Sequence, residues 1–311
     1  MLRTGYNTHK TGLLLLFAAA LLLVGCDDSS RGLGPEYSEN DDRYPSWSPD
    51  GETILFASLR VNALSDLFIM NTDGSNGTIL TDPGLYSSEE SSTWSPDGSK
   101  IAYTALRRYE QGDIFEIFIM NPDGQEKTRL VSQARFQTWS PDGGKIAFVS
   151  WRDGPSDIYT ANPDGTDIVR LTYNAEVMDG VGGELSWSPD STLIAFVSDR
   201  DDSREIFVVD VNDTTQVRLT DNPGMISDSP VWSPDGSKIA YVSNIDSYFD
   251  IFVMNADGSD SVNLTMSEYN DDQPDWSPDG TKIVFSSTIP PHQSKLFIMD
   301  VDGSNIIQIT Q

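Results

Sequence analysis

Trp276-Ser277-Pro278-Asp279-Gly280 is the last of six copies of one short motif, and this motif decides the fold. Trp-Ser-Pro-Asp recurs with its tryptophan at positions 47, 94, 139, 187, 232 and 276, and glycine completes five of the six copies. The successive intervals are 47, 45, 48, 45 and 44 residues. Such a period is typical of sheet-like units that bury their faces only against neighbours of the same kind. We therefore expect each repeat to be one blade of a β-propeller.

The sixth repeat, residues 270–310, predicts four short strands. An extended stretch at 273–277 leads into the Ser-Pro-Asp-Gly turn, in which Pro, Asp and Gly each suit their turn position. Residues 282–286 (KIVFS) and 295–300 (KLFIMD) are β-branched and aromatic runs, and the second run ends in another tight turn. A less regular fourth strand ends at Ile309-Thr310. The predicted fold class is all-β, a six-bladed propeller with four antiparallel strands per blade.

The repeat boundaries also predict how the ring is assembled. The blades are expected at about residues 41–81, 82–131, 132–172, 173–220, 221–265 and 266–311. Each unit begins at its inner strand and ends at its outer strand, so the first and last blades should close by packing, without a shared strand. The six tryptophans should fill the wedges between neighbouring sheets, each burying ~150–250 Å², and are read as core.

The first forty residues have the pattern of an export and anchoring segment. Arg3 and Lys10 precede an apolar run at 13–24 that is too short to span a bilayer. Cys26, the single cysteine of the chain, directly follows, and the segment resembles a bacterial lipobox, which implies a signal peptide at 1–25 and lipidation of Cys26. Acyl chains on one residue would anchor the protein without a transmembrane helix. Polar residues 26–40 are expected to be a flexible tether.

The charge of the chain excludes some partners. The formal net charge is −28, and since the first 25 residues contain two basic and no acidic side chains, the remaining chain carries −30. This charge disfavours nucleic acid and anionic lipid head groups and favours cations and basic partners. We expect an exported protein of the cell envelope, at the periplasmic or the outer surface, whose only membrane contact is the N-terminal lipid; the membrane itself is left open.

The combined pattern WSPDG…KIAF.S…DIF.MN.DG…LT over residues 41–310 resembles the TolB-type propeller, a WD-like repeat family. In the fourth unit Ser191 replaces the turn glycine, a local departure from the pattern. The resemblance implies a noncatalytic adaptor that docks peptidoglycan-associated partners. TolB itself carries an α/β domain before its propeller, and the span between Cys26 and Asp41 is too short for one, which weakens a simple equivalence.

The expected topology separates two faces of the disc. The turn face carries the Ser-Pro-Asp-Gly and Asn-x-Asp-Gly turns, whose composition turn geometry explains. The loop face carries the connections that vary, which are residues 59–65, 105–112, 151–156, 199–203, 244–248 and 288–294 together with the links between blades. Binding residues usually lie on such loops. Aromatic side chains there serve peptide or sugar contacts, and the expected partner-binding residues are Tyr109, Trp151, Tyr173 and Tyr248.

A second group of charged residues precedes the blade tryptophans by four or five positions and should line the mouth of the central channel. Its members are Asp42, Glu90, Arg135, Asp228 and Asp272. Such a mouth could hold Ca²⁺, which takes oxygen ligands, or the basic end of a peptide; alternatively it is a solvated rim without a ligand. The sequence singles out no metal ligand set and no other cofactor.

The sequence argues against an enzyme. Beyond the signal segment there is one histidine, His292, and there is no G-x-S-x-G motif, so neither a histidine metal cluster nor a serine–histidine hydrolase site is predicted. The leading interpretation is a lipid-anchored propeller that binds an envelope protein or peptide. The alternatives are a propeller that binds carbohydrate or peptidoglycan, or a glycan-active enzyme that works through carboxylates alone.

Overall fold

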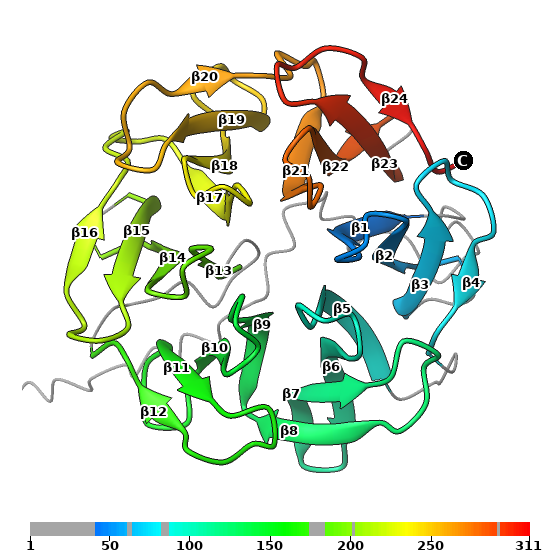
Figure 1. The fold of residues 1–311 in the computed structure, drawn as a ribbon, viewed down its shortest axis with the longest axis vertical. Helices are drawn as coiled ribbons and strands as arrows, with labels where there is room; N and C mark the ends of the chain where they lie inside the picture. Colours follow the sequence, from blue (N-terminus) through cyan, green and yellow to red (C-terminus); the bar gives the residue numbers. More distant parts are fainter. Residues whose placement is uncertain (1–40, 61–63, 82–86, 174–183, 201–202, 291–292) are drawn as a thin grey trace, which may run out of the picture. The chain divides into compact units, whose positions relative to one another are not determined.

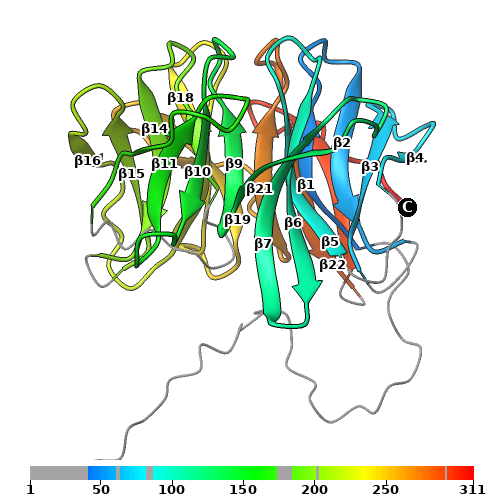
Figure 2. The same cartoon turned by 90° about the horizontal axis from the view of Figure 1, so that it is seen from below.

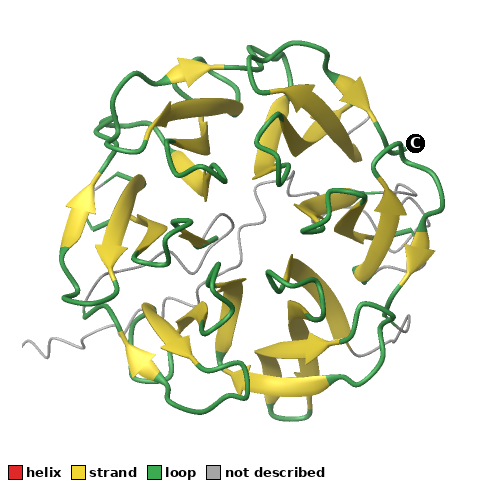
Figure 3. Ribbon diagram, in the orientation of Figure 1, coloured by secondary structure: helices red, strands yellow, loops and turns green. Residues whose placement is uncertain are grey.

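The computed structural model describes residues 41–60, 64–81, 87–173, 184–200, 203–290 and 293–311. The predicted signal peptide, Cys26 and the tether lie outside the described residues. Within the described part the secondary structure consists of strands and connections (Figure 3). It contains no helix long and apolar enough to cross a membrane.

Six four-stranded antiparallel sheets surround a central axis, which confirms the predicted fold class (Figure 1). Each sheet contains four strands that are consecutive in the chain. From inner to outer strand the blades are β1 Asp42–Trp47, β2 Thr53–Ser58, β3 Asp66–Asn71 and β4 Thr78–Ile79; β5 Ser87–Trp94, β6 Ile101–Tyr109, β7 Gly112–Met120 and β8 Thr128–Ser132; β9 Ala134–Trp139, β10 Ile146–Ser150, β11 Asp157–Ala161 and β12 Val169–Arg170; β13 Ser186–Trp187, β14 Leu193–Ser198, β15 Glu205–Asp210 and β16 Gln216–Arg218; β17 Ser227–Trp232, β18 Lys238–Ser243, β19 Asp250–Asn255 and β20 Val262–Asn263; β21 Asn270–Trp276, β22 Lys282–Ile289, β23 Gln293–Asp300 and β24 Ile307–Gln308.

The ring closes by packing and side-chain hydrogen bonds, as expected, because no strand is shared between the first and sixth blades. Trp47 packs in one apolar cluster with Leu296 and Ile298 of the sixth blade. The backbone N–H of Trp47 donates to Asp275 Oδ2 at 2.8 Å, and the N–H of Tyr44 donates to Gln273 Oε1 at 2.9 Å. Two polar side chains of the inner strand β21 thus bind the backbone of β1.

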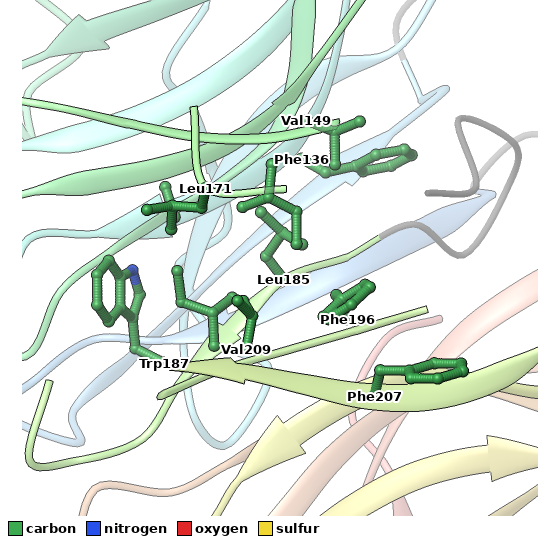
Figure 4. Close-up of a cluster of buried hydrophobic side chains, with 11 residues drawn as sticks. Phe136, Val149, Leu171, Leu185, Trp187, Phe196, Phe207 and Val209 are labelled. Atoms are coloured by element: carbon green, nitrogen blue, oxygen red, sulfur yellow. The ribbon is translucent and has the colours of Figure 1, made fainter. Parts of the chain in front are cut away.

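The six repeat tryptophans form the core between blades, and each is only 6–9% exposed. Trp187, at the end of β13, illustrates the packing: it shares an apolar cluster with Phe136 and Leu171 of the third blade and with Phe196 of its own blade (Figure 4). Its indole Nε1 also donates to Thr138 O across the blade boundary at 3.3 Å. These contacts confirm the wedge-filling role predicted for the repeated tryptophan.

The Ser-Pro-Asp turns are held by their own side chains. In the first blade Ser48 Oγ donates to Asp50 Oδ1 at 2.6 Å and accepts from the backbone N–H of Thr53, while the N–H of Glu52 donates to the same carboxylate. Hydrogen bonds to the charged form lower the pKa of such an aspartate, and in the second blade they lower the pKa of Asp97 to about 2. The acids of these turns are therefore structural.

Five of the six outer strands end earlier than the sequence indicates, because the side chain of the terminal threonine takes the place of the backbone ladder. The outer strand β8, which has Val131 in place of the threonine, continues to Ser132. Strand β24 stops at Gln308, and beyond it the N–H of Leu296 donates to Thr310 Oγ1 at 2.9 Å. The inner strand differs as well. It begins at Asn270, three residues before the expected start, and Pro274 lies at a bulge where no ladder donor is needed.

Candidate functional site

The inner strands carry a repeated bulge where they line the channel. Pairing between the first and second strands shifts register three or so residues before the tryptophan in five blades. At this point a residue that is not glycine adopts a φ of 46–57°; these residues are Tyr44, Ser91, Phe136, Ser229 and Gln273. Each such backbone costs about 1–2 kcal/mol. The same strained position recurs in five blades around one axis, so the bulge is a regular part of the channel wall.

A cavity of about 140 Å³ lies beside these bulges, and every blade lines it with residues that stand one to three positions before its tryptophan. Its lining is mixed: Tyr44 and Phe136 are aromatic, whereas Gln137 and Glu184 are polar. The amide of Gln137 ties two blades together, because it accepts from Thr104 Oγ1 at 2.7 Å and donates to the carbonyl of Ala102 at 3.2 Å. The channel wall is thus cross-braced at this level.

Six charged side chains, one from each blade, form what we call the channel layer: Arg43, Glu90, Arg135, Glu184, Asp228 and Asp272. Charges alternate in the first three blades, where Glu90 is stabilised by Arg135 and Arg43. The last three blades supply only acids. Arg204 compensates one of them, with Nη1 2.7 Å from Asp228 Oδ2.

The acidic half of the channel layer holds protons more tightly than free carboxylic acids do. Burial, and then repulsion by Asp272, raises the pKa of Glu184 to about 7. Burial likewise raises the pKa of Asp272 and of Asp228, the latter despite Arg204. Ser229 Oγ lies 3.0 Å from Glu184 Oε2 and 3.4 Å from Asp272 Oδ1, so that one hydroxyl bridges two carboxyl groups from different blades.

These raised pKa values predict that the propeller is more stable at pH 5.5 than at pH 8. Glu184 has an ordinary pKa of 4.5 and a folded-state pKa of about 7, so the native state binds more protons between these values and its stability falls as the pH rises through that window. The Glu184→Gln variant should gain about 1 kcal/mol at pH 8, part of the effect being screened by solvent. Urea unfolding at the two pH values measures both quantities.

The matched control for this experiment is Glu52→Gln, which removes the same charge from an exposed turn. It should leave the pH dependence of unfolding unchanged. If both variants reduced the pH dependence of the free energy of unfolding equally, net charge and not the channel layer would set that dependence.

Four of the five residues predicted for the channel mouth, namely Glu90, Arg135, Asp228 and Asp272, belong to the channel layer. Asp42 is placed differently. Its carboxylate is buried and accepts from Ser58 Oγ at 2.6 Å and from Arg60 Nη2 at 2.6 Å within its own blade. Sequence reasoning missed Glu184, because in the fourth unit the charge stands three positions before the tryptophan instead of four or five.

Arginines on the loop face cover aromatic rings at a constant position in the repeat. In each of the first four blades an arginine follows the aromatic residue of the second strand by four positions and lies over the ring of that residue or of its partner in the third strand; these are Arg60, Arg107, Arg152 and Arg200. The guanidinium of Arg200, for example, lies 4.3 Å from the ring centre of Phe207. At the same position the fifth and sixth blades have Ile245 and Ile289.

A second arginine in three blades neutralises a buried acid of the third strand. Arg129 pairs with Glu116 at 2.9 Å and Arg218 with Glu205 at 3.0 Å, and Arg170 pairs with Asp157. In the fifth blade Asn263 takes this position and donates to Asp250 Oδ2 at 2.9 Å. The first four blades therefore supply several arginines to the loop face, whereas the fifth blade supplies none of its own.

The four predicted partner-binding aromatics come from different blades and links. Tyr109 lies at the tip of the β6–β7 hairpin, which extends beyond the other blades (Figure 2), and its hydroxyl donates to Glu116 Oε2 at 2.9 Å. Trp151 is half-buried, edge-on to Phe115 with ring centres 6.2 Å apart. Tyr173 lies under Arg170, and Tyr248 is 48% exposed.

The candidate site contains no recognisable metal centre in the ranges that the structure describes. No group of three or more histidine, cysteine, aspartate or glutamate side chains there is arranged to hold an ion. The chemistry available at the channel and the loop face is hydrogen bonding, charge pairing and apolar contact.

Comparison with known proteins shows which proteins this chain resembles. Residues 177–311 match the family model described as the TolB beta propeller domain. A TolB-assigned protein from Agrobacterium tumefaciens has a similar structure, with a TM-score of 0.64 and 25% identity over 77% of this chain and 86% of its own. The chain is a six-bladed β-propeller, and its residues 177–311 are similar to the TolB beta propeller domain. No curated protein matches the sequence.

Other structures share the fold of this propeller at lower sequence identity. TolB from Acinetobacter baumannii has a TM-score of 0.67 at 24% identity, over 89% of this chain and 65% of its own length. An oligogalacturonate lyase from Vibrio parahaemolyticus has a TM-score of 0.58 at 14% identity, over 88% of this chain and 79% of its own. The same scaffold thus occurs in proteins described as TolB and in an enzyme, so the fold alone does not decide the function.

Proposed function

We propose that this TolB-like propeller is a noncatalytic binding module that docks an envelope protein or peptide on its loop face. The observation that carries the proposal is the distribution of exposed large apolar side chains among the described residues. Seven of them lie in loops and links of the loop face: Tyr109, Tyr173, Met225, Ile245, Tyr248, Met266 and Tyr269. The six Ser-Pro-Asp turns have none.

Exposed apolar side chains on variable loops are the usual material of a protein interface. The other exposed large apolar residues lie on the outermost strands and the turns leading to them; they are Ile168, Val169, Val217, Val262, Val301, Ile306 and Ile307. Those positions recur from blade to blade and belong to the edge of each sheet. The loop face is therefore where this chain differs from a plain repeat and where a specific partner is recognised.

The N-terminal segment suggests where the partner is met. The lipobox-like sequence ending at Cys26 supports export and lipid anchoring, and the TolB likeness supports the cell envelope as the compartment. An anchored propeller on a polar tether would sample partners near the membrane surface.

An enzymatic role has less support. The lyase neighbour shares only the fold, at 14% identity. Glu184 and Asp272 are linked through Ser229 inside the channel layer, and burial is the main cause of their raised pKa values. This arrangement links three blades, which supports a structural role for the two carboxyl groups.

Retention experiments separate protein binding from glycan binding. The full chain is immobilised and exposed in parallel to solubilised envelope proteins and to peptidoglycan sacculi. We expect a discrete envelope protein to be retained and sacculi to pass, and we expect Tyr109→Ala combined with Tyr248→Ala to weaken that retention at least about tenfold. The matched control is Val217→Ala combined with Val262→Ala, which removes exposed apolar side chains from outer strands.

Retention of sacculi that is lost in the tyrosine variant would replace the proposal with glycan binding. Retention that falls equally in both double variants would assign the contact to nonspecific apolar adhesion.

A further inference from the structure

Basic residues are distributed unequally over the propeller. Arg218 is the last arginine of the chain, and the remaining 93 residues contain only three lysines, Lys238, Lys282 and Lys295. Lys238 and Lys282 lie on the turn face, where they bind Asn255 and Asp300. Lys295 is buried and donates to Gln311 O at 2.7 Å. Within the described residues, the fifth and sixth blades themselves thus contribute no exposed cation to the loop face.

The fifth blade also lacks both arginine contacts found in its predecessors. Ile245 stands where Arg200 covers the aromatic pair of the fourth blade, and Asn263 stands where Arg218 pairs with Glu205. The nearest arginine, Arg204, is engaged with Asp228 at 2.7 Å. Arg218 lies 2.8 Å from Asp221 and neutralises it, so the acidity of this sector comes from the exposed Asp246 and Glu268.

Five of the seven exposed apolar residues of the loop face belong to this same sector, and we name them the blade-5 patch: Met225, Ile245, Tyr248, Met266 and Tyr269. Met266 is 75% exposed, Tyr248 48% and Ile245 37%. They come from the link before the blade, from the β18–β19 loop and from the link after it. Figure 1 shows this blade, β17–β20, between the fourth and sixth blades.

Hydrogen bonds that involve backbone and side-chain atoms join these three segments into one surface. On one side the N–H of Ile226 donates to Asn244 Oδ1 at 2.7 Å, and Ser243 Oγ donates to the carbonyl of Ile226 at 2.8 Å. On the other side the N–H of Asp271 donates to the carbonyl of Phe249 at 2.7 Å. Both links are therefore fixed against the β18–β19 loop, and the patch is held in place before any partner binds.

We propose that the blade-5 patch binds a partner polypeptide segment that combines apolar side chains with lysine or arginine. The inference rests on the proposed protein-binding function and specifies its partner by charge and apolarity. Met and Tyr supply adaptable and large contact area, while the acidic rim attracts a basic segment and repels acidic ones. A second copy of this chain is disfavoured as occupant, because its corresponding surface carries the same negative charge.

The probe is a short synthetic peptide of alternating leucine and lysine, measured by fluorescence anisotropy with the full chain. Ile245→Ser, Tyr248→Ser and Met266→Ser are combined, since all three side chains are exposed and their loss should not unfold the protein. We expect the affinity to fall about tenfold or more, and we expect a serine–lysine peptide to bind the unaltered chain comparably weakly. Circular dichroism checks that the variant is folded.

The matched control combines Val169→Ser, Val217→Ser and Val262→Ser, which are equally exposed residues of outer strands. This control should keep the affinity of the unaltered protein. Glu268→Gln should lower the association rate and its salt dependence, as expected for a rim charge. An affinity that survives the blade-5 variant, or that falls equally in the control, overturns the proposal.

Two further outcomes also overturn it. Binding of neutral phosphatidylcholine vesicles through the patch, without peptide binding, would assign the surface to lipid. If the peptide fails to bind but an envelope protein is still retained through Tyr109, the blade-5 proposal is wrong while the proposed function stands; loss of both contradicts the function itself.

Discussion

Replacement of Trp187 by alanine should destabilise the propeller by about 3–5 kcal/mol, the range for truncating a large buried aromatic. The indole lies between the third and fourth blades, packs against Phe136 and Leu171, and donates a hydrogen bond to Thr138 O (Figure 4). Alanine would remove the apolar contact and leave a cavity at the blade boundary. Urea unfolding followed by circular dichroism measures the change.

Trp151→Ala is the matched control, because it makes the same substitution at the one tryptophan outside the repeat. Trp151 is half-buried on the loop face and contacts Phe115 edge-on, so its loss should cost less than about 1.5 kcal/mol. Equal destabilisation by the two substitutions would contradict the wedge-filling role of the repeated tryptophan.

Gly124→Ala should destabilise the protein by about 3 kcal/mol. This glycine closes the second tight turn of the second blade at a φ of +78°, and a Cβ there would lie 2.2 Å from the carbonyl oxygen of Leu80 in the preceding blade. The obstacle is backbone, which cannot rotate aside as a side chain would. The substitution therefore forces two neighbouring blades apart, and thermal or urea unfolding reports the loss.

Gly98 provides a control within the same blade. Its φ of +69° is similar, but a Cβ would meet no atom within 4 Å, so Gly98→Ala should cost only the backbone strain of about 1–2 kcal/mol. The difference between the two variants isolates the close approach between blades. A Gly124→Ala cost no larger than that of Gly98→Ala would show that turn geometry alone selects the glycine.

The architecture could be predicted from the sequence because the same motif recurs in every blade. Six copies of Trp-Ser-Pro-Asp fix the blade number, and the β-branched runs after them fix the inner hairpins. The ends of the outer strands could not be predicted in the same way, because Thr310 and its counterparts satisfy the ladder with a side-chain oxygen. When a hydroxyl oxygen accepts the hydrogen bond in place of a backbone carbonyl, the hydrophobic periodicity of the sequence does not change, so the strand end cannot be predicted from it.

The candidate site was less predictable, because it depends on contacts between units. Asp42 stands five positions before its tryptophan and Glu90 four, and the prediction joined these two offsets. Asp42 turns into its own blade towards Arg60, whereas Glu90 lies between Arg43 and Arg135. Glu184 escaped notice since its blade departs from the common spacing. The arginines over the aromatic pairs, by contrast, stand at a constant offset and could have been found by aligning the repeats.

Face-resolved photocrosslinking tests the central claim most directly. A photoreactive residue is placed in the full chain at Tyr109 or Tyr248 on the loop face, and at Ser99 or Ser237 in exposed Ser-Pro-Asp turns, and envelope extract is irradiated with each variant. The account predicts one discrete crosslinked partner from the loop-face positions and none from the turns. Crosslinks to that partner from the turn face alone, or with equal yield from both faces, would contradict it.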